Sequence, residues 1–86
     1  RTENRIQAVL VKRVADATAR VSSANEMFSE VINHFASGLP HPDGSLRIKK
    51  ASSELSAARA GRMEAHKRLT DFIERGIVPE DLKRTS

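Results

Sequence analysis

The chain has 86 residues, no cysteine and a formal net charge of +4, from 15 basic and 11 acidic side chains. This length allows a single domain with a thin core. The lack of cysteine excludes disulfides, thiolate chemistry and cysteine-based zinc sites. No run approaches the roughly 20 apolar residues of a membrane span, and the start at Arg1 lacks the layout of a signal peptide. We expect one cytoplasmic domain over residues 1–86, complete or part of a longer protein.

Apolar residues recur every three or four positions in the first part of the chain. They lie at Leu10, Val14, Ala17, Val21, Ala24, Phe28, Val31 and Phe35. Alternating steps of this kind form a heptad seam, which is typical of helices that pair in coiled coils. Thr2 suits the N-cap, and Gly38 suits the left-handed position that often ends a helix. The sequence therefore predicts a helix over residues 2–37.

Glycine and proline interrupt this pattern in residues 38–44 and predict a loop. Ser45 suits the N-cap of a second helix over residues 45–75, which Gly76 would end. The seam continues at Ile48, Ala51, Leu55, Ala58, Arg62, Ala65, Leu69 and Phe72, so Arg62 is its one charged member. In the tail, residues 76–86, Pro79 and the acids after it predict one short helical turn.

Two seams joined by a short loop predict an all-α fold, a long antiparallel hairpin resembling a coiled coil. With a turn between His41 and Pro42, the numbers of facing residues sum to about 83. Large apolar residues then meet near both ends of the hairpin. Between them, a band of alanines and Gly61 leaves little side-chain bulk. In that band the helices either approach closely or leave a groove.

Further apolar residues flank the two seams. They are Ile6, Val9, Val11, Met27, Ile32, Met63 and Ile73. A stripe wider than one seam needs another neighbour, so we expect a homodimer that forms a four-helix bundle, or a hairpin packed on a partner helix. The residues expected at the oligomer or partner interface are Leu10, Val14, Val21, Met27, Phe28, Ile32, Phe35, Leu55, Met63, Leu69, Phe72 and Ile73.

No pattern of residues predicts catalysis or a bound metal or cofactor. His34, His41 and His66 fall at a helix end, in the loop and midway along the second helix, so they do not converge on a metal site. Glycine-rich phosphate loops, nucleophile elbows and metalloprotease motifs are absent. We therefore expect no enzyme, no cofactor and no metal site.

Charged residues occur largely in pairs four positions apart, such as Asp16 with Arg20 and Glu64 with Arg68, which stabilise exposed helix faces. Two basic clusters remain as a possible anion or partner patch, with members Arg20, Arg59 and Arg62 midway along the hairpin and Arg47, Lys49 and Lys50 near its tip. We predict a non-enzymatic helical interaction module that self-associates and presents a surface to a protein partner. The alternative is a hairpin that binds nucleic acid through these basic clusters.

Overall fold

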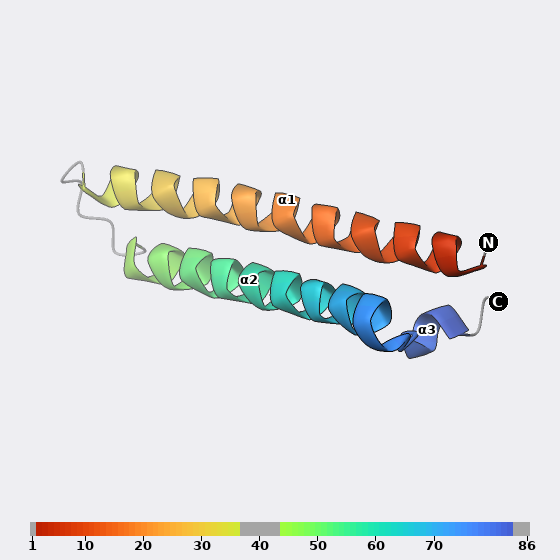
Figure 1. Cartoon of the computed structure of the whole chain (residues 1–86). Helices are drawn as coiled ribbons and strands as arrows, with labels where there is room; N and C mark the ends of the chain where they lie inside the picture. Colours follow the sequence, from red (N-terminus) through yellow and green to blue (C-terminus); the bar gives the residue numbers. More distant parts are fainter. Residues whose placement is uncertain (1, 37–43, 84–86) are drawn as a thin grey trace.

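A computed structural model describes residues 2–36 and 44–83, and this part of the chain is helical apart from residues 76–79. Helix α1 runs over Thr2–Ala36, α2 over Gly44–Arg75 and α3 over Glu80–Lys83. The two long helices lie side by side and antiparallel (Figure 1), in a molecule that measures 57 × 20 × 16 Å. The predicted all-α helical hairpin is confirmed. Neither long helix, as far as the structure describes it, has an apolar stretch sufficient to cross a bilayer.

The helix ends agree with the prediction to within one residue where the structure describes them. Helix α2 begins at Gly44 rather than at Ser45, a difference within the usual uncertainty of a helix boundary. The loop was predicted over residues 38–44, and Gly44 instead begins α2. Residues 37–43 and the side chains of Phe35 and Ser45 lie outside the described residues. The capping role of Ser45 therefore stays a prediction.

The heptad seam forms the core between α1 and α2. Every seam residue whose side chain is described is buried or half-buried, including Arg62. Leu10 is the most completely enclosed of the large side chains, with 1% of its surface exposed, and Leu55, Ala51 and Ala58 are also buried. Because burying a large aliphatic side chain contributes about 1.5 to 3 kcal/mol, the seam holds the hairpin together, as its period predicts.

Gly76 ends α2, as expected, in a left-handed conformation with φ of 69°. Its amide donates to the carbonyl of Phe72 at 3.0 Å, and the next amide, of Ile77, donates to the carbonyl of Asp71 at 3.3 Å. Both bonds satisfy carbonyls that a helix end otherwise leaves unpaired. A residue with a Cβ is strained in this conformation, so glycine fits the end of α2.

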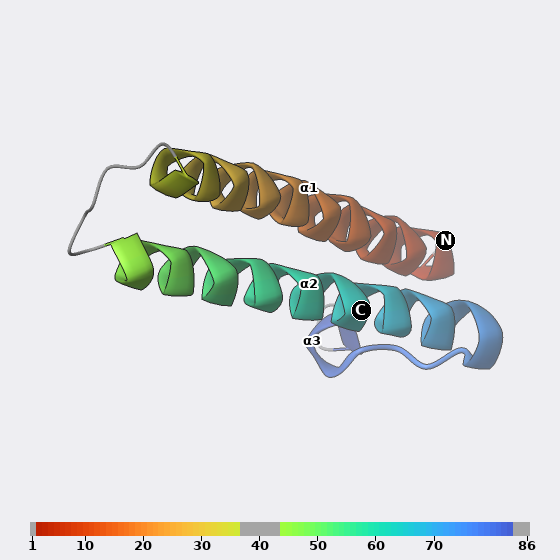
Figure 2. The ribbon, with the colours of Figure 1, turned by 90° about the vertical axis from the view of Figure 1, so that its left-hand side faces the viewer.

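The tail then turns back along α2 and forms the short helix α3 (Figure 2). The carbonyl of Pro79, the residue just before α3, accepts from the amides of Leu82 at 3.0 Å and Lys83 at 3.2 Å. The predicted helical turn is confirmed. An ion pair between Asp81 and Arg13 joins α3 to α1, a contact that no pattern in the sequence predicts.

Two members of the wide apolar stripe are covered within the single chain. Ile6 is buried and Val9 half-buried, near the end of the hairpin to which the tail returns. Val78, Pro79 and Leu82 of the tail are half-buried as well. The tail, whose Asp81 pairs with Arg13 of α1, therefore lies at the end of the hairpin where these two members are covered.

Candidate functional site

The heptad assignment divides the hairpin into two sides. With Val14 at position a, the g positions of α1 include Arg13 and Arg20, and those of α2 include Gly61 and Arg68. These four residues line one groove. The g positions of the two helices therefore lie together on one side of the seam, and the e positions lie on the other.

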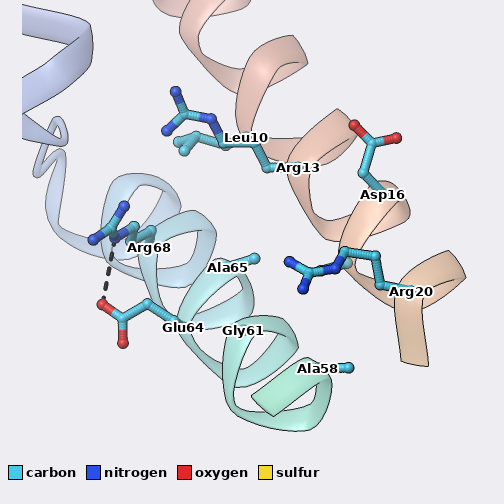
Figure 3. Close-up of a pocket in the computed structure, with 10 residues that line it drawn as sticks. Leu10, Arg13, Asp16, Arg20, Ala58, Gly61, Glu64, Ala65 and Arg68 are labelled. Carbon is cyan, nitrogen blue, oxygen red and sulfur yellow. Dashed lines mark ion pairs between the residues drawn. The ribbon is translucent and has the colours of Figure 1, made fainter. Parts of the chain in front are cut away.

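A groove with a volume of about 300 Å³ runs along the g side, and we call it the arginine groove. Its floor consists of small side chains, Ala17, Ala58, Gly61 and Ala65, and Leu10 also lines it. Figure 3 shows the charged side chains that border this floor from both helices. Its full lining is Leu10, Arg13, Asp16, Ala17, Arg20, Ala58, Gly61, Glu64, Ala65 and Arg68. Small residues thus leave a groove where larger ones would fill the space between the helices.

Ion pairs engage two of the three arginines of the groove. Arg13 donates a hydrogen bond to Asp81, which lowers the pKa of that carboxyl, and the positive charge of Arg68 acts in the same direction. The Nε atom of Arg68 lies 3.4 Å from Oε1 of Glu64, so this predicted pair is confirmed. Arg13 is half-buried and the other three groups are exposed, so both pairs lie at the surface and each contributes little to folding.

Arg20 is different, because it makes no ion pair with any residue in 2–36 or 44–83. Asp16, its predicted partner, instead lies 3.1 Å from the Nζ atom of Lys12. Lys12 and Arg20 both lie four positions from Asp16, and the prediction overlooked Lys12, on the N-terminal side. Figure 3 shows the guanidinium of Arg20 reaching from α1 toward α2 over the groove.

The structure divides the predicted patch of Arg20, Arg59 and Arg62. Arg20 lies on the groove side, and Arg59 occupies an exposed e position on the opposite side. Arg62 is half-buried on the seam and lines a different, shallow hollow with Met63 and His66. Facing residues whose numbers sum to about 83 predict how far along the hairpin each arginine lies. This sum does not predict on which side of the seam the arginine lies. The heptad assignment would have grouped Arg20 with two arginines that the prediction missed, Arg13 and Arg68.

The opposite side is exposed along its whole described length, and we call it the low-charge face. Its large apolar members are Val11, Ile32, Met63 and Ile73, and its formally charged members, Lys49 and Arg59, both belong to α2. The face comprises the e and b positions of both helices, namely Asn4, Ala8, Val11, Ala15, Thr18, Ser22, Asn25, Ser29, Ile32, Lys49, Ser52, Ser56, Arg59, Met63, His66, Thr70 and Ile73.

The residues predicted for the interface whose side chains are described fall into two groups, and Phe35 lies outside them. The hairpin itself buries or half-buries Leu10, Val14, Val21, Phe28, Leu55, Leu69 and Phe72. Met27, Ile32, Met63 and Ile73 remain exposed. Met27 occupies a g position and so lies on the groove side, whereas the other three lie on the low-charge face. The exposed residues are therefore the ones free to meet another chain.

The predicted basic tip is exposed, as Arg47, Lys49 and Lys50 begin α2 without an acidic residue in its first turn. They occupy positions g, b and c, so they spread around the helix. The described residues contain no group of three side chains that would hold a metal ion, and His41 lies outside them.

Comparison with protein-family models finds no match, and neither do the searches of curated proteins and of solved structures.

Proposed function

We propose that the chain is a non-enzymatic helical module that self-associates and presents a surface to a protein partner. The exposure of large apolar side chains outside the seam carries this proposal. Met63 is 72% exposed, Ile73 60% and Met27 55%. Single exposed apolar residues are ordinary on protein surfaces, but Val11, Ile32, Met63 and Ile73 share one face. A second layer of helices would bury them, as in a four-helix bundle.

The surface for a protein partner is the arginine groove. Arg20, which has no ion-pair partner among the described residues, lies over a floor of small side chains, and guanidinium groups bind carboxylates with two parallel hydrogen bonds. The contact of Asp81 with Arg13 supports this role, because there the groove side already holds a carboxylate of the tail. A protein partner is favoured over nucleic acid because Asp16 and Glu64 also line the groove and would repel phosphates.

Sedimentation equilibrium across a concentration series, with helicity recorded in parallel, tests self-association. We expect the mass to rise toward twice 9.5 kDa as concentration increases. A constant mass of one chain at every concentration would reject self-association.

Affinity for duplex DNA measured over a range of salt concentrations tests the alternative, since binding through phosphates weakens steeply as salt rises.

A further inference from the structure

We propose that a second copy of this chain covers the low-charge face, with each α1 lying on the α2 of the other copy. The ends of α1 at Ala36 then lie at the same end of the dimer. This inference rests on the proposed self-association and adds the surface and the arrangement. It takes the face, rather than the groove, as the surface between copies.

The low-charge face is open and large enough for a stable dimer. The tail lies on the other side, since Asp81 pairs with Arg13 at a g position. Even a side of 57 by 16 Å, the longest and the shortest extents of the molecule, exceeds the roughly 800 Å² that each partner buries in an interface of standard size. The groove side offers less free area, because α3 and its ion pairs occupy part of it.

The composition of this face suits contact between helices. Small residues recur every seven positions along α1, at Ala8, Ala15, Ser22 and Ser29, and all of them are exposed. Small side chains let a neighbouring helix approach closely, and the large side chain of Met63 then has space opposite them. The cores of protein interfaces are depleted in charged residues, and this face is the side of the hairpin with few of them.

Charge selects the arrangement. The basic residues of the face, Lys49 and Arg59, belong to α2, and the half-buried Arg62 lies beside them on the same helix. If α2 lay on α2 of the other copy with the ends reversed, Arg59 and Arg62 of both copies would meet near the middle, where like charges repel. If α2 lies on α1 of the other copy, each helix with these cations meets one whose share of the face carries no formal charge.

The antiparallel register provides matching groups for this second arrangement. Three polar residues of α1 in one copy lie at the same level along the bundle as three donor side chains of α2 in the other. The pairs are Thr18 with His66, Ser22 with Arg62 and Asn25 with Arg59, so hydroxyl and amide oxygens face donors. Toward the end of the hairpin away from the loop, Val11 of one copy lies at the same level as Ile73 of the other, and both are exposed in the single chain. A two-fold axis makes each of these contacts twice. The face is therefore complementary to itself.

Matched lysine substitutions of two exposed apolar residues test the face. Ile73→Lys places a charge on the low-charge face, and Met27→Lys places one on the groove side, at positions of similar exposure. We expect Ile73→Lys to weaken the dimer about tenfold or more, and Met27→Lys to leave its dissociation constant within about twofold. Helicity at high concentration checks that both variants fold. If Met27→Lys alone weakened the dimer, the low-charge face would be rejected as the surface between copies, while self-association would stand.

Spin labels test the arrangement in the wild-type interface. The chain has no cysteine, so Leu46→Cys places one label on exposed helix surface near the start of α2 in each copy. Pulsed electron paramagnetic resonance should give a distance of about 20 to 30 Å across a bundle with helices about 8 to 10 Å apart. Reversed copies would separate the labels by about 45 Å, at about 1.5 Å per residue, and overturn the arrangement. A label signal without any coupling, together with a monomer mass, would instead reject self-association itself.

Discussion

The groove side and the low-charge face flank one seam, at its g and e positions, but differ in what covers them. On the groove side, acids and arginines alternate around a floor of alanines and Gly61, and the tail returns to pair Asp81 with Arg13. On the low-charge face, apolar and small polar residues lie exposed, and no other described segment covers them. The seam therefore determines the hairpin, while the flanking positions give each side its own chemistry.

The largest expected effect comes from Leu10, which supports the seam and also lines the arginine groove. It is 1% exposed, so Leu10→Ala removes buried contacts and enlarges the groove. We expect a loss of about 2 to 5 kcal/mol in the free energy of unfolding, measured by urea denaturation at fixed protein concentration. Leu46→Ala, at a site 66% exposed, is the control and should change stability by less than about 0.5 kcal/mol. Equal effects of the two changes would contradict the seam as the core.

Gly61 and Gly76 predict opposite responses to alanine. Gly76 has φ of 69°, where a Cβ costs about 1 to 2 kcal/mol, so Gly76→Ala should lower the free energy of unfolding by that amount. Gly61 lies within α2, and a Cβ there meets nothing within 4 Å. Gly61→Ala should therefore raise the free energy of unfolding by about 0.5 to 1 kcal/mol, because alanine favours helix. Thermal and urea unfolding of both variants measure the difference.

Gly61→Ala also sharpens the comparison between the two sides, because Gly61 lies on the floor of the arginine groove. A methyl group there should leave the dimer mass unchanged at every concentration if the copies meet on the low-charge face. Weaker dimerisation in a more stable Gly61→Ala chain would place the contact between copies in the groove instead.

The period of the apolar residues was sufficient to predict the hairpin. The steps of three and four positions identified the seam, and Gly76 and Pro79 marked where α2 ends and the next turn begins. These features are local, because propensity and patterning act over a few residues. The same pattern also placed Arg62 on the seam, where it is half-buried.

The docking of the tail was beyond reach of the sequence, because it depends on contacts between distant residues. Asp81 and Arg13 stand 68 positions apart, and no periodicity links them. The band of small side chains predicts two alternatives, a groove or a close approach of the helices, because small side chains permit either empty space or close packing. The arginine patch was misgrouped for a different reason. Pairing residues by height ignored the heptad position, which separates Arg20 from Arg59.

The smallest expected effect concerns the contact of Asp81 with Arg13. The hydrogen bond from Arg13 lowers the pKa of Asp81 below its ordinary value of 3.8, so folding favours the ionised carboxylate. Its contribution to stability is present above pH about 4 and is lost as pH falls through the lowered pKa. Arg13→Gln should raise the pKa of Asp81 toward 3.8, followed by the carboxyl carbon shift in nuclear magnetic resonance. Arg20→Gln, in the same groove but without this contact, should leave that pKa unchanged. An equal rise in both variants would mean that the general positive charge of the groove side, rather than the Arg13 contact, holds the tail.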